Sequence, residues 1–164
     1  MQKAVFLDRD GVINDNSKHY YVFKDDQLVY NPDVLDVIKS FYDAGYLVIV
    51  ISNQGGVSRG LYETKDVDVL HEKIKKDVEA IGGKITDFYF CPHHDKVEKC
   101  LCRKPSSLLI ERAAAAYDVD LAASYLIGDS ERDVEAGNNA GLNKSFKVEA
   151  NGSCKDIIAQ IVAE

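Results

Sequence analysis

Two aspartates one residue apart, Asp8 and Asp10, follow the apolar run at residues 4 to 7 and are followed in turn by Gly11. Carboxylates carried past the end of a buried strand can converge on one reacting centre while the backbone turns away at the glycine. Such a pair suits phosphoryl transfer: one carboxylate attacks phosphorus, and the other moves a proton to the leaving oxygen and back from water. A divalent cation would offset the charge that opposes their approach to a phosphate. The alternative is a strand end that is merely acidic.

Three more polar segments follow in the order that such an enzyme needs. Residues 52 to 56 (SNQGG) end the apolar run 47 to 51, Arg103 and Lys104 precede Pro105 and a helical pattern, and residues 128 to 133 (GDSERD) end the run 125 to 127. Together these marks resemble those of the haloacid dehalogenase (HAD) superfamily of aspartate-dependent phosphatases. The strings DRDGVIN (8–14), SNQGGVSRG (52–60), CPHH (91–94) and CLCRKP (100–105) are also similar to those of the D-glycero-D-manno-heptose 1,7-bisphosphate phosphatases and the related histidinol-phosphate phosphatases.

The resemblance implies a role for each catalytic residue. Asp8 would be the nucleophile that forms an aspartyl-phosphate, and Asp10 the general acid and base. Ser52 would donate its hydroxyl to the phosphoryl oxygens, and Lys104 would neutralise charge on Asp8 and on the phosphate. Mg²⁺ would be held by Asp8, Asp129 and the backbone carbonyl of Asp10, with water and a phosphate oxygen in the remaining positions.

Two further polar residues are interpreted more loosely. Asp133 either orients Lys104 or a water on the metal, or complements the dipole of the helix that begins near residue 131. His71 lies inside a predicted helix and is interpreted as structural or solvated, with no catalytic role.

Substrate recognition falls to few residues, because no insertion is long enough for a separate cap domain and the site is expected to be open. By resemblance, Asn53, Arg59 and Arg103 contact the sugar and a second phosphate, which the planar fork of arginine suits. Residues 18 to 21 form either a flap over the ligand or a polar turn before a β-hairpin. The alternative for Arg59 is a surface residue on a loop, with no contact to the substrate. The predicted substrate contacts are Lys18, His19, Tyr21, Ser52, Asn53, Gln54, Arg59, Arg103 and Lys104.

Three cysteines and a histidine within twelve residues form a set that suits tetrahedral Zn²⁺: Cys91, His93, Cys100 and Cys102. Unligated thiols are the alternative, since disulfides are rare in the cytosol. Four protein ligands leave no open position, so the zinc would be structural and would fix the loop that presents Arg103 and Lys104. The resemblance agrees with this set and leaves His94 outside it, and Cys154 is interpreted as a free thiol.

Apolar runs alternate with helical periodicity along the chain. Strands are predicted at residues 3–8, 47–52, 85–91, 124–128 and 144–149, and helices at 32–44, 64–81, 106–117, 131–140 and 154–163. Asn31 and Thr64 are the expected N-caps of the first two helices, with Pro32 at the first helical position of the former. The alternation predicts an α/β fold with a doubly wound, mostly parallel, Rossmann-like sheet and helices on both faces. Ligands bind beyond the carboxyl ends of the strands in such sheets, where every candidate residue falls.

Length and composition limit the possibilities. With 164 residues, the chain is long enough for one domain (1–164, with the zinc loop at about 91–105 inserted) and too short for two. No apolar stretch approaches the ~20 residues that span a bilayer, and no leader precedes the first strand, so a cytoplasmic protein with no membrane contact is expected. A net charge of −7 argues against nucleic-acid binding but not against a small anionic substrate. We expect a monomer.

The resemblance admits two substrates with the same chemistry. One is a heptose 1,7-bisphosphate, whose C7 phosphate would be removed in the synthesis of nucleotide-activated heptose; the other is histidinol phosphate, in histidine synthesis. The heptose is favoured because the chain lacks the dehydratase domain that accompanies many histidinol phosphatases. A zinc-stabilised binding module without catalysis is least favoured, since every residue required for turnover is present. The residues do not distinguish the two anomers at C1.

Overall fold

A five-stranded parallel sheet organises the chain in the computed structural model, which describes residues 1–163. The strand order is β3-β2-β1-β4-β5, and every neighbouring pair is parallel. The strands are β1 (Ala4–Leu7), β2 (Leu47–Asn53), β3 (Asp87–Cys91), β4 (Tyr125–Gly128) and β5 (Lys144–Lys147). This confirms the prediction of a doubly wound α/β fold without a large cap domain.

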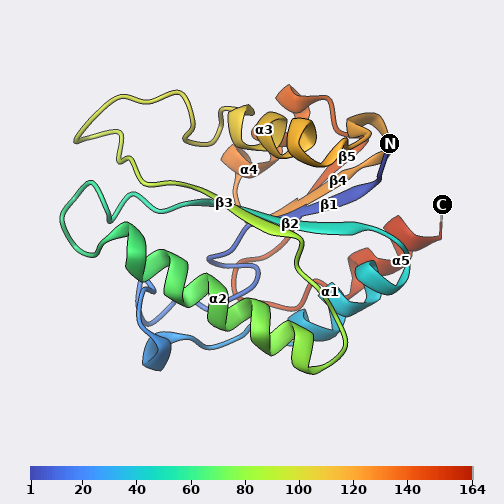
Figure 1. The fold of residues 1–164 in the computed structure, drawn as a ribbon, viewed down its shortest axis with the longest axis horizontal. Coiled ribbons are helices and arrows are strands. Elements are labelled where there is room, and N and C mark those ends of the chain that lie inside the picture. The colour runs from blue at the N-terminus through green and yellow to red at the C-terminus, as the bar shows by residue number, and fades with distance from the viewer. Residues whose placement is uncertain (164) are drawn as a thin grey trace.

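The helices cover both faces of the sheet (Figure 1). One layer holds α1 (Val34–Asp43), α2 (Thr64–Ala80) and α5 (Asp156–Val162), and the other holds α3 (Leu108–Tyr117) and α4 (Glu131–Ala140). Two short 3₁₀ turns, η1 (Asp25–Gln27) and η2 (Leu121–Ala123), complete the regular structure of residues 1–163. None of these helices has the length and apolar character needed to cross a membrane.

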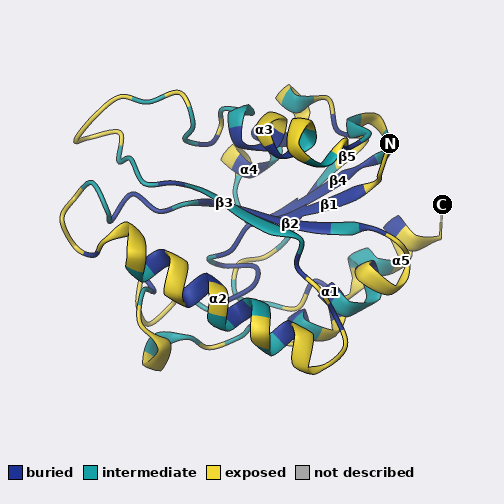
Figure 2. Cartoon of the chain, viewed as in Figure 1, coloured by how far each residue is buried: buried dark blue, intermediate teal, exposed yellow. Residues whose placement is uncertain are grey.

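The central strand β1 separates two apolar layers. Val5 and Leu7 pack with the residues of the α1, α2 and α5 layer, whereas Ala4 and Phe6 pack on the α3 and α4 side. All four are fully buried, as Figure 2 shows for the middle of the sheet. A strand buried on both faces reads as a continuous apolar run, which is why β1 could be predicted from four residues.

The N-caps of the first two helices differ from the prediction, and α3 begins at Leu108 and not at 106. α1 begins at Val34 with Asp33 as its N-cap in a left-handed conformation (φ 65°), and Asn31 instead donates its side-chain amide to the carbonyl of Val12. α2 is capped by Glu63, so that Thr64 is the first helical residue. The terminal helix is shorter than predicted, and the strand predicted at 85–91 begins at Asp87. Each shift moves an element boundary without changing the order of the elements.

The loops that follow β1, β2, β3 and β4 lie at the carboxyl edge of the sheet. In Figure 1 the segments after β2 and β3 extend together to the left of the sheet. The residues of the Asp8, Ser52, Lys104 and Asp129 segments all come from this edge, because parallel strands end on the same side.

Candidate active site

Lys104 lies between two carboxylates at this edge. Its Nζ is 2.8 Å from Asp8 Oδ1 and 2.5 Å from Asp133 Oδ1, and it also donates to the backbone carbonyl of Ile51 over 3.1 Å. Burial alone would lower the pKa of Lys104, but the charges of Asp8 and Asp133 outweigh it and hold that pKa above its ordinary value. The lysine is therefore cationic at the point where the strands end.

The carboxylates around Lys104 repel one another. Burial raises the pKa of Asp8 well above its ordinary value, with Asp133 and Asp129 adding to the effect and Lys104 opposing it. Burial likewise raises the pKa of Asp129. For Asp133 burial acts in the same direction, but the charge and hydrogen bond of Lys104 exceed it and lower the pKa. A site with this much buried negative charge favours a bound cation.

The oxygens of the cluster fit a hard divalent cation. One oxygen each from Asp8, Asp129 and Asp133 lies within 4.8 Å of the others, and carboxylate oxygen is the ligand type that Mg²⁺ prefers. Gly11 leaves room for the Asp129 carboxylate, since a Cβ at Gly11 would lie 2.0 Å from Asp129 Oδ2. The predicted carboxylate ligands Asp8 and Asp129 are thus brought together.

Both oxygens of Asp133 are already engaged. Oδ1 binds Lys104, and Oδ2 accepts hydrogen bonds from the backbone N–H groups of Asp129 (3.1 Å) and Ser130 (3.2 Å) and from the Ser130 hydroxyl (3.0 Å). Ser130 in turn caps α4 by accepting from the Asp133 N–H. Asp133 therefore orients Lys104 and also lies in the first turn of α4, where its charge complements the helix dipole.

Asp10 is held by donors from three directions. Its Oδ1 accepts from Arg9 Nε (3.2 Å), Arg9 Nη2 (2.9 Å) and Asn14 Nδ2 (3.0 Å), and its Oδ2 accepts from Gln54 Nε2 (2.9 Å). Arg9 was not predicted as part of the site, because its place between the two aspartates is its only local signal. The carboxylate of the predicted general acid is consequently fixed in the free protein.

Gln54 lies behind the cavity and supports the residues in front of it. Its Nε2 donates to Ser52 Oγ (2.7 Å) as well as to Asp10, and its Oε1 accepts from the Tyr62 hydroxyl (2.7 Å). Gln54 and Ser52 are each 1% exposed, and neither lines the cavity. A Cβ on Gly56 would lie 2.2 Å from the Tyr62 ring, so the glycine lets the tyrosine reach the amide. Tyr62 was missed, because its hydroxyl meets Gln54 only in three dimensions.

A cavity of about 200 Å³ opens over these groups. Of the predicted site residues, those that line it are Asp8, Asp10, Tyr21, Asn53, Arg103, Lys104 and Asp129. Two more lining residues were interpreted with alternatives: Tyr20, in the possible flap, and Asp133, beside Lys104. The lining residues that were not predicted are Asn16, Gly55, His94, Ser130 and Arg132. Lys18 and His19 are exposed and do not line it, and no β-hairpin follows them within residues 1–163.

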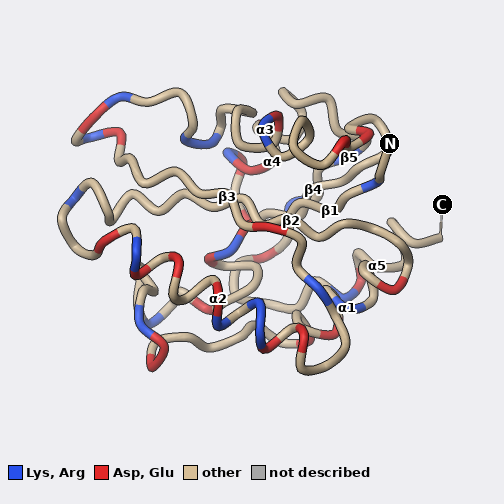
Figure 3. Tube along the Cα trace, in the orientation of Figure 1, with Lys and Arg blue, Asp and Glu red and all other residues tan. Residues whose placement is uncertain are grey.

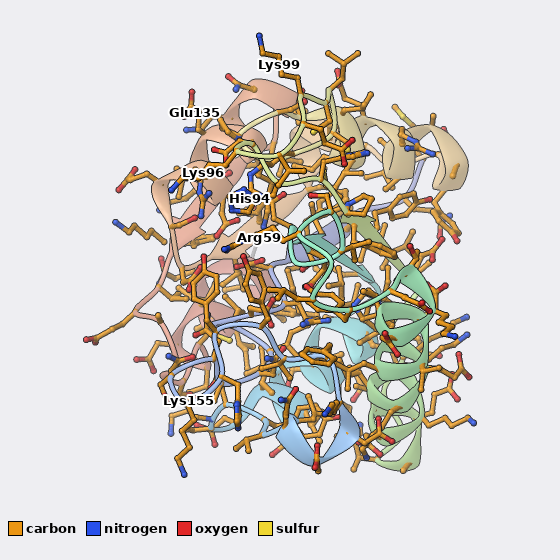
Figure 4. The ribbon with its side chains drawn as sticks, turned by 90° about the vertical axis from the view of Figure 1, so that its left-hand side faces the viewer. Arg59, His94, Lys96, Lys99, Glu135 and Lys155 are labelled. Carbon is orange, nitrogen blue, oxygen red and sulfur yellow. The ribbon has the colours of Figure 1, made fainter. Side chains whose placement is uncertain are left out.

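The mouth of the cavity is basic. At Gly55 a Cβ would lie 3.0 Å from the His94 ring and 3.1 Å from Arg103 Nη1, so these two side chains flank the same glycine. Arg103 Nη1 donates a hydrogen bond to the backbone carbonyl of His93 (3.1 Å), which restrains the arginine side chain. Arg59 does not line the cavity itself, but it donates a hydrogen bond to the hydroxyl of Tyr21, which does (3.2 Å). Figure 4 looks onto this end of the molecule, with Arg59 and His94 labelled next to each other.

Asn53 joins the strand to the segment that carries Lys104. Its Oδ1 accepts from the backbone N–H of Lys104 (3.0 Å), and its Nδ2 donates to the Lys104 carbonyl (3.4 Å). A side chain predicted to contact sugar is thus also the anchor of the lysine backbone.

The predicted zinc ligands form one cluster. Cys91 Sγ lies 2.9 Å from Cys102 Sγ and 3.6 Å from Cys100 Sγ, and His93 Nδ1 lies 3.2 Å from Cys102 Sγ. All four donor atoms are within 4.8 Å of one another, a soft donor set that fits zinc. His94 lies outside the cluster and lines the cavity instead. Cys154 is buried elsewhere as a free thiol, and burial raises its pKa to about 11.

A parallel sheet that presents a buried lysine and clustered aspartates beyond its central strands defines a phosphatase core of the HAD class. In agreement with this, a family model described as HAD-hydrolase-like matches residues 101–146. The chain belongs, more narrowly, to the D-glycero-D-manno-heptose-1,7-bisphosphate 7-phosphatases, as three comparisons show.

The D-glycero-α-D-manno-heptose-1,7-bisphosphate 7-phosphatase of Photorhabdus laumondii is 37% identical over 152 residues, covering 89% of this chain and 82% of that protein. The D-glycero-β-D-manno-heptose-1,7-bisphosphate 7-phosphatase of Rhodopseudomonas palustris is 40% identical over 145 residues, covering 85% of this chain and 79% of that protein. The crystal structure of D,D-heptose 1,7-bisphosphate phosphatase from B. bronchiseptica, complexed with magnesium and phosphate, has a TM-score of 0.84 at 34% identity and covers 96% of this chain and 86% of its own.

Proposed function

We propose that this chain is a Mg²⁺-dependent phosphatase that removes the C7 phosphate from D-glycero-D-manno-heptose 1,7-bisphosphate. The observation that carries the proposal is Lys104, buried between Asp8 and Asp133 in a cavity that also holds Arg103. A cation beside a nucleophilic carboxylate suits one phosphate, and a second cation at the mouth suits another. The family membership supplies the identity of the sugar.

The reaction proceeds in two displacements. An oxygen of Asp8 forms a bond to phosphorus as the bond from phosphorus to the C7 oxygen breaks, and Asp10 gives its proton to that leaving oxygen. Water then attacks the phosphorus of the aspartyl-phosphate, Asp10 takes a proton from the water, and phosphate leaves Asp8. Lys104 stays charged throughout and stabilises the oxygens of the transferring group.

The carboxylates of Asp8 and Asp129, with the backbone carbonyl of Asp10, would hold Mg²⁺. Asp133 is not included, since Lys104 and the donors at the start of α4 already occupy both of its oxygens. The bound cation would supply charge compensation for the phosphate. Support comes from the B. bronchiseptica relative, whose structure contains magnesium and phosphate.

The distal phosphate is bound at the mouth by Arg103, His94 and Arg132. All three line the cavity, and Arg132 has no ion pair in the described part of the chain. Lysines and arginines elsewhere are interspersed with acidic residues around the molecule (Figure 3). Tyr20 and Tyr21 form the neighbouring wall, in edge-to-face contact with ring centroids 4.8 Å apart, against which the sugar lies.

We also assign zinc to the Cys91, His93, Cys100 and Cys102 cluster, as a structural ion. Burial, the largest cause, raises the pKa of Cys91, so in the absence of an ion this thiol stays protonated. A bound zinc would stabilise the thiolates and close the segment that leads directly to Arg103 and Lys104.

Initial rates of phosphate release with Mg²⁺ test the substrate. The panel holds heptose 1,7-bisphosphate as both anomers, histidinol phosphate and several sugar monophosphates. We expect one heptose bisphosphate anomer to lead the other compounds by about 100-fold or more in kcat/KM. Asp8→Asn should remove turnover while the far-UV circular dichroism stays that of the wild type. Equal rates across the panel, or a leading rate for histidinol phosphate, would contradict the proposed substrate; turnover by Asp8→Asn would contradict the covalent mechanism.

A further inference from the structure

A fully buried arginine lies between the two catalytic aspartates. Arg9 is 0% exposed, although its guanidinium carries a charge at every accessible pH. Burying such a group opposes folding unless each of its donors finds an acceptor, and apolar residues of similar size stabilise a core at least as well. A role in stability alone therefore does not account for Arg9.

The acceptors around Arg9 give it a single orientation. Nε and Nη2 both donate to Asp10 Oδ1, Nη2 also donates to the Val22 carbonyl (2.6 Å), and Nη1 lies 3.2 Å from His71 Nε2. Asp10 Oδ1 thus accepts from two Arg9 nitrogens and from Asn14 Nδ2. Asp10 Oδ2 accepts only from Gln54 within the described residues. The two oxygens of the general acid have different surroundings.

The tautomer of His71 follows from this arrangement. An arginine can only donate, so Nε2 of His71 is an acceptor and the ring proton is on Nδ1. The ring is 4% exposed, comes from α2, and stacks on Phe88 with centroids 4.4 Å apart and planes 17° apart. Burial and the charge of Arg9 lower the pKa of His71 to about 2, which keeps the imidazole neutral and able to accept. Neither His71 nor Arg9 lines the active-site cavity.

We propose that Arg9 and His71 are positioning residues for proton transfer: Arg9 occupies Asp10 Oδ1 so that Oδ2 alone exchanges the proton, and His71 holds Arg9 in that orientation. The proton on Oδ2 passes to the C7 oxygen as the phosphorus–oxygen bond breaks, and Oδ2 later takes a proton from the attacking water. The inference rests on the proposed phosphatase mechanism and adds two residues that do not touch the substrate.

Leaving-group dependence separates proton transfer from the rest of the chemistry. An alkoxide leaves only with a proton, whereas 2,4-dinitrophenolate is a stable anion that leaves phosphorus without one. Formation of the aspartyl-phosphate from 2,4-dinitrophenyl phosphate therefore needs Asp8 and Lys104 but not the Asp10 proton. Its rate is measured as the first burst of dinitrophenolate, before slow hydrolysis of the intermediate.

Four variants are compared with the wild type: Arg9→Lys, His71→Leu, His71→Gln and Phe88→Leu. Lysine lacks the two-nitrogen fork, leucine cannot accept from Arg9, glutamine keeps an acceptor oxygen, and Phe88→Leu disturbs the packing around His71 without removing a hydrogen bond. For Arg9→Lys and His71→Leu we expect kcat on heptose 1,7-bisphosphate to fall about 100-fold and about 10-fold, with KM within about threefold. The dinitrophenolate burst should change by less than about threefold, and His71→Gln should recover most of the loss.

Equal losses on both substrates would overturn the proposal, because a general distortion of the site slows both. Equal kcat values for His71→Leu and Phe88→Leu would also overturn it. If Arg9→Lys does not fold, the comparison of His71→Leu with His71→Gln still tests the proposal, with the folding of both variants checked by thermal melting. If the wild type hydrolyses neither substrate, the proposed function has failed and the inference fails with it. If the wild type turns over and the variants have the same kcat on heptose 1,7-bisphosphate, only the inference is overturned.

Discussion

At Asp8 two opposing effects meet on one side chain. Burial favours the neutral acid, and Lys104 favours the carboxylate that can attack phosphorus. The balance depends on the second carboxylate, Asp133, which keeps Lys104 in place although it also repels Asp8. A single buried lysine is therefore shared by two acids, and the protonation state of the proposed nucleophile Asp8 depends on it.

Replacing this lysine should affect both turnover and stability. In Lys104→Met two buried carboxylates lose their partner, so we expect kcat to fall about 100-fold or more. The free energy of unfolding without metal should fall by about 3 kcal/mol, as when one partner of a buried ion pair is removed. Steady-state rates and urea unfolding measure the two effects.

Lys147→Met provides the matched control, because Lys147 is half exposed and its ion pair with Glu131 lies at the surface. It should change stability by less than about 0.5 kcal/mol and leave kcat unaltered. Wild-type rates in Lys104→Met would remove Lys104 from the mechanism.

At the scale of elements, the loop after β1 and the segment between β4 and α4 approach each other at Gly11. The φ of Gly11 is +91°, and the space where its Cβ would lie is filled by Asp129. Two requirements meet at this residue, one of backbone conformation and one of close approach, and they can be separated by experiment.

Gly11→Ala should weaken magnesium binding, and Gly45→Ala should not. Gly45 has a φ of +89° but open space around its Cβ position, so both variants carry the left-handed penalty of about 1–2 kcal/mol in stability. Only Gly11→Ala displaces Asp129, so we expect the Mg²⁺ concentration that gives this variant its half-maximal rate to rise about tenfold or more. A magnesium titration of phosphate release compares them, and identical titrations would contradict the role given to Asp129.

Zinc and catalysis should be linked through the segment from residue 91 to residue 105. Cys102 lies two residues before Lys104, so Cys102→Ser should lower zinc content and reduce kcat about 10- to 100-fold by misplacing the lysine. Cys154→Ser removes a buried thiol outside the cluster and is the control. Elemental analysis and steady-state rates are measured on the same samples. Full turnover by zinc-free protein would disprove the coupling.

At the scale of the whole molecule, the strand and helix order could be predicted because β1 to β4 are short, mostly apolar runs and each βα unit repeats the pattern. β5 (KSFK) contains a single apolar residue and was predicted from its place after a helix that ends at Gly141. The N-caps of the first two helices could not, because Asp33 takes a left-handed conformation (φ 65°) and Glu63 caps α2 one residue before the expected Thr64. In the site, residues in local motifs were predictable. His71 and Tyr62 were not, because their partners Arg9 and Gln54 come from other segments and their contacts leave no local spacing.

The neutral His71 gives the fold a predictable acid sensitivity. In the unfolded chain its imidazole takes up a proton at the ordinary histidine pKa of 6.5, whereas in the folded protein that pKa is lowered to about 2. The unfolded state therefore binds more protons below pH 6.5, and stability falls as the pH falls. Between pH 7.5 and 5.5 the wild type should lose about 1.4 kcal/mol more than His71→Gln in urea unfolding. Parallel pH dependences of the two proteins would contradict a neutral buried imidazole.

The loop of six residues between His93 and Cys100 begins and ends at the thiol and imidazole cluster. Its first residue, His94, lines the cavity. Because both ends are tied to the same point, added residues would extend only the free part of the loop, and each doubling of its length costs about 0.6 kcal/mol. Neither the edge strand β3 nor Lys104 has to move. Residues 94 to 99 are thus where this fold can evolve, or be engineered, to accept a leaving group of another shape.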